Sequence, residues 1–350
     1  MTHESTSTSH TIAIFQVRQI LQGARRHGYD VEPLLIRAGI SPLLLDSPLS
    51  RVSQLQYARL LSLLRKQMRD EYVGLCSRPV KIGSFARLCE DLVRCQRLGE
   101  ALRSGFSFSH LLIDDFSARL IIDRGMAHVR IRATNDADPV LAFAERMFLF
   151  FSLGVASWLV GRRLPLLQVH YRGAPCGRRD DLYRIFQAPV SFEHDYFGYS
   201  FESRWLELPV VQHPLTVKDF VRQAPATLLI KYRDETSLSE RIRRLLRRHL
   251  DQDLPTLDEV GETLGLTPQT LRRRLRDEGE CYQSLKDRLR CDAAIEYLGK
   301  PELSLVDIAS MVGFSEPSTF HRAFKKWTGL PPGEYRTSRL SAAARMAAIA

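Results

Sequence analysis

The stretch GFSEPSTFHRAFKKWTG, residues 313–329, decides the fold of the C-terminal part of the chain. Phe320 and Phe324 are four residues apart, so a helix would place them on one face. Arg322, Lys325 and Lys326 lie between and after them and would point elsewhere. A milder counterpart, GLTPQTLRRRLRDEG, occupies residues 265–279. The two stretches predict two short helices, each with an apolar face and a cationic face.

The two stretches belong to an internal repeat. Its offset is 48 residues at first and 49 residues after one insertion in the second copy. The matched pairs are Leu257 with Leu305, Val260 with Ile308, Gly261 with Ala309, Leu264 with Val312, Gly265 with Gly313, Thr270 with Thr319, Leu271 with Phe320, Arg273 with Arg322, Leu275 with Phe324 and Arg276 with Lys325. A repeated unit of this length indicates two copies of one small helical motif.

Each copy has the parts of a helix-turn-helix. A first helix, 256–264 or 304–312, ends at a glycine that can adopt the left-handed conformation and turn the chain. A second helix follows, and we expect Thr267 or Ser315 to cap it. The small residue at Gly261 or Ala309 allows the two helices to cross closely. Residues 282–299 predict a long helix connecting the copies.

Rotation of about 100° per residue separates an inward from an outward face on each second helix. A solvated charged face is the common explanation of such a run, but two copies with matched glycine, cap and arginine positions favour a DNA-reading role. The outward residues are Gln269, Arg272, Arg273 and Arg276 in the first copy, and Ser318, His321, Arg322 and Lys325 in the second.

The preceding residues mix helix and strand patterns. Residues 12–27 and 54–68 have helical periodicity, 118–134 predict two strands around a turn, and 166–171 predict another strand. The fold class is therefore an α+β N-terminal domain followed by an all-α DNA-binding domain with two helix-turn-helix units. The expected division is a tail at 1–10, the N-terminal domain at 11–215, which we expect to serve in effector sensing or dimerisation, a linker at 216–236, the DNA-binding domain at 237–339 and a tail at 340–350.

Composition limits the remaining possibilities. The net charge is +10, but residues 231–350 hold 21 Lys and Arg against 18 Asp and Glu, so overall charge does not locate a DNA site. The six cysteines include no C-x-x-C pair, and we expect neither a metal nor a cofactor. The first ten residues lack a secretory pattern, and the apolar run 147–160 is short for a membrane span, so it predicts a buried helix and a cytoplasmic protein.

The C-terminal residues resemble the AraC/XylS family of bacterial transcription regulators. The resemblance covers residues 237–337 and rests on SLVDIASMVGFSEPSTFHRAFKKWTGLPPGEYR, residues 304–336. It implies contacts with duplex promoter DNA, including base contacts from Gln269, Arg272, Arg273, Ser318, His321 and Arg322, and we expect backbone contacts from Thr270, Arg276, Thr319, Lys325 and Lys326. The first copy departs from the family in having Gly261 where alanine is common, which predicts a small loss of helix stability.

The N-terminal residues resemble the long mixed sensor domain of the branch that includes ornithine-utilisation and virulence regulators. They differ from the double-stranded β-helix of the arabinose regulator in opening with helices. This resemblance implies sensing of a small-molecule effector, formation of a homodimer, or both, and the family implies activation through RNA polymerase. Aromatic residues such as Phe143, Phe148, Phe151, Trp158 and Tyr171 suit either an effector pocket or an ordinary core.

Two other functions stay open from the sequence. One is an alkyl-transfer repair enzyme fused to a DNA-binding domain, which needs an activated cysteine beside histidine; Cys176 follows Pro175 but precedes Gly177. The other is a DNA-binding protein without any ligand. The chain has no G-x-S-x-G, P-loop or dinucleotide-binding motif, so we expect no catalytic residues.

Overall fold

The computed structural model describes residues 11–134, 138–173, 186, 188–228, 237–278 and 280–337. The chain forms two compact units, each of which joins segments that are distant in sequence. The first unit contains residues 1–18, 30–60 and 235–350, and the second contains 19–29 and 61–234. Helices α1 (Ile14–Arg26) and α3 (Gln54–Met68) pass from one unit to the other.

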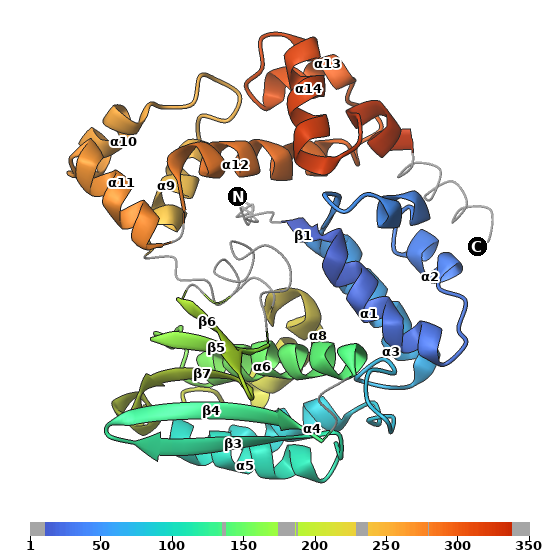
Figure 1. Ribbon diagram of the computed structural model, residues 1–350, viewed down its shortest axis with the longest axis vertical. Helices are drawn as coiled ribbons and strands as arrows, with labels where there is room; N and C mark the ends of the chain where they lie inside the picture. The colour runs from blue at the N-terminus through green and yellow to red at the C-terminus, as the bar shows by residue number, and fades with distance from the viewer. Residues whose placement is uncertain are drawn as a thin grey trace. The chain divides into compact units, whose positions relative to one another are not determined.

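The second unit is built around a sheet with the strand order β3-β4-β7-β5-β6 (Figure 1). Its pairs are antiparallel except β5 and β6, which are parallel. The strands are β3 (Phe116–Asp123), β4 (Met126–Ala133), β5 (Gln168–Arg172), β6 (Val190–His194) and β7 (Phe197–Glu202), and the helices are α4 (Ser84–Leu92), α5 (Leu98–His110), α6 (Pro139–Leu159), η2 (Ser203–Glu207) and α8 (Pro214–Leu228). This mixture confirms the predicted α+β class of the N-terminal region.

The core of this unit lies between the sheet and helices α5 and α6. Along β4, Val129 and Ile131 are buried, as alternation in a one-sided sheet requires. Phe148 of α6 contacts Phe106 of α5 and Phe116 of β3, with ring centroids 6.2 and 5.3 Å away. The hairpin predicted at 118–134 is present, and Arg124 and Gly125 form its turn with positive φ. The strand predicted at 166–171 begins at Gln168.

Helix α6 is longer than the apolar run that predicted it. By length and composition it could cross a membrane, but two-thirds of its most apolar window is buried within the protein. It also contains Glu145, which is fully buried and pairs with Arg172 at 2.9 Å. Phe143, Trp158 and Tyr171 are buried in the core. The helix is therefore a core element of this unit.

Residues 216–228, expected to belong to the linker, are helical. Pro214 begins α8, and Val217 and Phe220 are buried. The ring of Phe220 stacks on Trp158 with centroids 3.9 Å apart. The apolar contact explains why this segment is ordered into the second unit, although its prolines suggested a break. The rest of the expected linker, 229–236, lies outside the described residues.

The first unit contains the C-terminal helices and a small N-terminal part. The C-terminal helices are α9 (Leu238–Arg247), α10 (Leu257–Leu264), α11 (Pro268–Asp277), α12 (Tyr282–Tyr297), α13 (Leu305–Met311) and α14 (Pro317–Thr328), and the N-terminal elements are β1 (Thr11–Ala13), α2 (Glu32–Arg37), η1 (Pro42–Asp46) and β2 (Arg51–Ser53). The described part of residues 237–337 is helical with connecting turns, as predicted. The helix predicted from residue 12 begins at Ile14, because residues 11–13 pair with β2.

Candidate nucleic-acid interface

The first helix-turn-helix consists of α10 and α11. Thr256 caps α10, and Glu259 bonds back to the Thr256 amide at 2.7 Å, which forms a capping box. The hydrogen bonds from Thr256 hold the pKa of Glu259 below its usual value. Gly265 ends the helix with a φ of 65°, in the left-handed region. These contacts set where α10 begins and ends.

Gly261 allows the turn to pass close to α10. Leu266 donates its amide to the Gly261 carbonyl at 2.9 Å. A Cβ at position 261 would lie 2.6 Å from the carbonyl oxygen of Leu266, which is backbone and cannot swing away. The tight turn therefore requires glycine at this position. This gives a physical reason why the first copy has Gly261 where alanine is common in the family.

Helix α11 presents the outward face that the sequence predicts. The Thr267 side chain accepts the Thr270 amide, so the predicted cap is present. Leu271 and Leu275 are buried against the first helix and α9. The side chains that remain exposed are Gln269, Arg272, Arg273, Arg274 and Arg276, while Thr270 is half-buried. Among the described residues, the four arginines form no ion pair, so their charge faces solvent.

The second helix-turn-helix consists of α13 and α14. Ser304 and Asp307 form its capping box, which matches the box of the first copy and lowers the pKa of Asp307. Gly313 turns the chain with a φ of 74°. The prediction that Ser315 caps α14 is wrong. Pro317 is the first helical residue, and this makes Glu316 the cap position, with extended dihedrals and no side-chain cap bond.

Helix α14 buries an aromatic stripe and exposes a polar one. Phe320 and Phe324 are fully buried, and Phe324 also contacts the buried ring of Tyr335 at 5.5 Å. The exposed residues of the outward face are Ser318, Arg322, Lys325 and Lys326, while Thr319 and His321 are half-buried. The His321 ring lies 6.0 Å from Phe320. His321 is thus the least accessible of the predicted base-contacting residues.

Helix α12 joins the two motifs and contacts the start of the first and the turn of the second. The Tyr282 hydroxyl donates to the carbonyl of Pro255, just before α10, and burial raises the pKa of Tyr282 to about 12. Arg290 donates to the Gly313 carbonyl at 3.1 Å and lies over the Phe314 ring. The two recognition helices lie toward opposite ends of α12 (Figure 1). The arrangement suits two separate contacts with DNA.

The structure places the eleven predicted DNA-contacting residues on two helices without bringing them into one cluster. Their individual roles at bases or phosphates remain predictions. Sequence reasoning missed Arg274, which is exposed on α11. In the alignment of the two repeat copies, Arg274 corresponds to Ala323. It also missed Glu278, which accepts the amides of Leu238 and Ser239 and so fixes the start of α9. Both glutamate contacts are 2.9 Å long.

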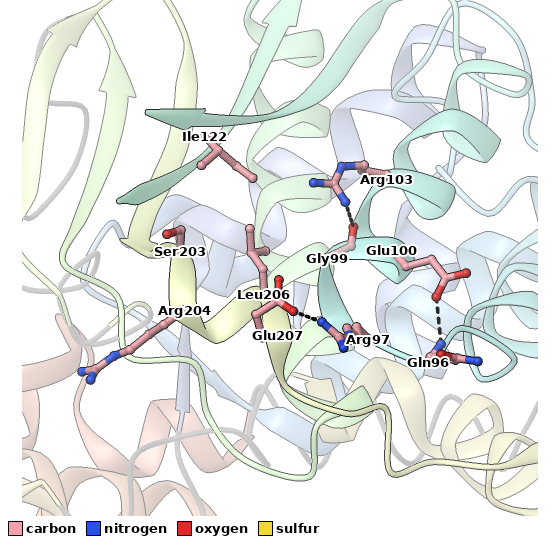
Figure 2. Close-up of a pocket in the computed structure, with 10 residues that line it drawn as sticks. All are labelled: Gln96, Arg97, Gly99, Glu100, Arg103, Ile122, Ser203, Arg204, Leu206 and Glu207. Atoms are coloured by element: carbon pink, nitrogen blue, oxygen red, sulfur yellow. Dashed lines mark hydrogen bonds and ion pairs between the residues drawn. The ribbon is translucent and has the colours of Figure 1, made fainter. Parts of the chain in front are cut away.

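The second unit has a pocket of about 410 Å³. It lies among the start of α5, the end of β3 and η2 (Figure 2). Arg97 pairs with Glu207 across it, and Arg103 donates to the Gly99 carbonyl at 3.3 Å. The remaining lining residues are Gln96, Glu100, Ile122, Ser203, Arg204 and Leu206. Charged groups of both signs line it together with the apolar side chains of Ile122 and Leu206. None of the aromatic residues considered from the sequence lines it.

Two family models match the chain. Residues 28–210 match the model described as the arabinose-binding domain of AraC transcription regulator, N-terminal, and residues 260–338 match a helix-turn-helix domain. The first model alone spans just over half of the chain. Both matches agree with the mixed fold of the second unit and with the helical motifs of the first.

Similar proteins cover one or both regions. The chain is 27% identical over 331 residues to the ornithine utilization regulator of Pseudomonas aeruginosa, a match that covers 94% of this chain and 97% of the relative. It is 26% identical over 257 residues to the regulator VqsM of the same organism, with 71% and 78% covered. Among solved structures, the regulator CdpR of P. aeruginosa is 20% identical with a TM-score of 0.30, covering 92% of this chain and 98% of that one.

The two capped motifs, the exposed cationic face on each recognition helix and the family matches agree on one assignment. The longer matched model is a domain of AraC regulators, and the ornithine utilization regulator aligns with the chain along nearly its whole length. The chain belongs to the AraC family of DNA-binding transcription regulators, with an arabinose-binding-type domain ahead of its helix-turn-helix domain.

Proposed function

We propose that the chain is a promoter-bound activator that reads one asymmetric DNA site with two unequal recognition helices. The observation that carries this proposal is the difference between the two outward faces. Helix α11 exposes Gln269 and four arginines, whereas α14 exposes Ser318, one arginine and two lysines. Arginine bridges guanine and glutamine bridges adenine in the major groove, so the two helices prefer different bases.

Randomised-site selection with the full chain tests the reading of two half-sites. Arg273→Ala and Arg322→Ala each relax the preference at separate positions about one DNA turn apart. Each costs roughly 1–3 kcal/mol of binding free energy if the lost contact is bidentate to guanine. If both variants blur the same positions, or if neither changes the preference, the assignment of one helix to each half-site is wrong.

The second unit supplies effector control and dimerisation in this proposal. We place a small polar effector in the pocket of Figure 2, where Arg103 and Glu100 offer charges of both signs beside Ile122, which is 50% exposed. One relative is named as an ornithine utilization regulator, which makes amino acids a natural first set to screen. The bound chain then acts on RNA polymerase in the cytoplasm.

A thermal-shift screen of the full chain tests the effector site. A ligand that binds only the folded state raises the melting temperature, and at a hundred times its Kd it stabilises by about 2.7 kcal/mol. Arg103→Ala abolishes that shift, while Arg119→Ala, an exposed arginine on β3 outside the lining, leaves it unchanged. A ligand whose shift survives Arg103→Ala binds elsewhere. Sedimentation equilibrium that finds only monomer contradicts the homodimer.

The enzyme alternative predicts zinc and methyl transfer. Cys176, the cysteine considered for that role, lies outside the described residues. Within the ranges that the structure describes, no three His, Cys, Asp or Glu residues are grouped as metal ligands. The named relatives are transcription regulators, and we propose no enzymatic role. Stoichiometric zinc in the purified protein, together with methyl transfer to a cysteine, would restore the enzyme alternative.

A further inference from the structure

The N-terminal segments of the first unit contact the second helix-turn-helix at the end of its recognition helix. Ser47 and Ser50 both donate their hydroxyls to the carbonyl of Thr328, at 3.0 and 3.1 Å. Thr328 is the last residue of α14, and carbonyls at a helix end have no partner within the helix. Gly329 follows with a φ of 80°, and a Cβ there would collide with the Ser47 hydroxyl. The two serines therefore close the C-terminus of α14.

A second contact ties the same N-terminal segments to the helices around α12. The amide and hydroxyl of Thr11 donate to one carboxylate oxygen of Asp292 on α12, at 3.2 and 2.5 Å. The other carboxylate oxygen of Asp292 accepts from Arg243 of α9. All three residues are at least nine-tenths buried. A buried charge of this kind needs its partners, so the contact holds β1 against α12.

A third contact completes the connection between strand β2 and the second motif. The Tyr335 hydroxyl donates to the carbonyl of Arg51 in β2 at 2.6 Å, and the Tyr335 ring packs on Phe324. Strand β2 pairs with β1, which carries Thr11. The two-stranded element thus reaches α12 through Thr11 and reaches Tyr335 through Arg51. The residues just before β2 reach the end of α14 through Ser47 and Ser50. We name residues 11–13 and 47–53 the N-terminal brace.

We infer that the N-terminal brace is part of the DNA-reading unit and that Ser47 and Ser50 are positioning residues for the second recognition helix. The inference rests on the proposed reading of two half-sites. A bidentate base contact requires its helix to be held within about 0.5 Å and 10–20° of the productive geometry. The motif itself holds the start of α14 through α13, while the brace holds its end. Helix α11 packs instead on α10 and α9.

The test combines protein variants with operator variants, all in the full chain. The operators are the selected site and the same site with the half read by α14 scrambled. Ser47→Ala/Ser50→Ala weakens binding to the intact operator about tenfold, because two hydrogen bonds are lost. On the scrambled operator the variant and the wild type bind equally. Tyr335→Phe removes one hydroxyl only and gives a smaller loss with the same pattern. Ser104→Ala, an exposed serine on α5, matches wild type throughout.

The outcomes separate this inference from the proposal on which it rests. Equal losses on both operators, or no loss on the intact one, overturn the positioning role of Ser47 and Ser50. A double variant that does not fold leaves Tyr335→Phe to decide by the same two criteria. A wild type that does not distinguish the two operators overturns the two-half-site reading, and the positioning role falls with it. Hydroxyl-radical footprints add an independent readout: protection fades only over the half read by α14.

Discussion

The two helix-turn-helix units have the same backbone plan but are stabilised differently. Each begins with a capping box and turns at a left-handed glycine. The first motif packs Leu271 and Leu275 and closes its turn tightly over Gly261. The second motif packs aromatic rings, has one more residue between its turn glycine and its recognition helix, and is contacted by the N-terminal brace. The comparison indicates that local capping defines each motif, whereas packing by distant residues distinguishes them.

Phe324→Ala should have the largest effect. Phe324 is fully buried between Phe320 and Tyr335, so its truncation lowers the free energy of unfolding by about 3–5 kcal/mol. Leu275→Ala in the first motif costs about 2–5 kcal/mol. Urea denaturation followed by far-UV circular dichroism measures both losses. A Phe324→Ala variant that is no less stable than the exposed control Lys325→Ala would show that the aromatic cluster does not stabilise the second motif.

Gly261→Ala should come next and tests the difference between the turns. Alanine gains about 1 kcal/mol of helix propensity over glycine. Here the new Cβ meets the Leu266 carbonyl, and the backbone shift that follows should cost more, for a net loss of about 1–3 kcal/mol. Ala309→Gly in the second motif is the matched control and should lose only about 1 kcal/mol, from propensity. Higher stability of Gly261→Ala in thermal melts would contradict the tight turn.

Thr267→Ala and Ser315→Ala compare the starts of the two recognition helices. Thr267 caps α11, so its loss should cost about 1 kcal/mol of unfolding free energy. Ser315 makes no cap bond because α14 starts at Pro317, and its replacement should fall within about 0.5 kcal/mol of wild type. Equal losses at both positions, measured by chemical denaturation, would mean that Ser315 caps α14 after all.

Lys326→Ala should have the smallest effect and concerns DNA binding alone. Lys326 is exposed on α14, to one side of the predicted base-reading residues, and we expect it to contact phosphate. Its loss should weaken all DNA sequences alike and lower the slope of log affinity against log salt by about one. Fluorescence anisotropy on selected and random duplexes, over a series of salt concentrations, measures both. A loss confined to the selected sequence would instead assign Lys326 to base reading.

Much of the helical region could be predicted because its signals are local. The repeat that pairs Leu271 with Phe320, the cap at Thr267 and the apolar stripe of residues 54–68 all depend on neighbours a few residues apart. One local prediction was wrong at Ser315, because a proline two residues later set the start of α14. Local chemistry therefore determines where these elements lie, and the position of proline can shift a boundary by a residue or two.

The sequence by itself determined the family, the two helix-turn-helix motifs and most of the side chains that each presents to solvent, since helical periodicity assigns the residues of a short helix to faces. Tertiary structure alone decided that residues 11–13 and 47–53 pack with the second motif. The bonds from Thr11 to Asp292 and from Ser47 to Thr328 each join residues 281 positions apart. Helix and strand periodicity relates only residues a few positions apart, so it could not predict these contacts. They form when polar groups buried in the folded chain find hydrogen-bond partners.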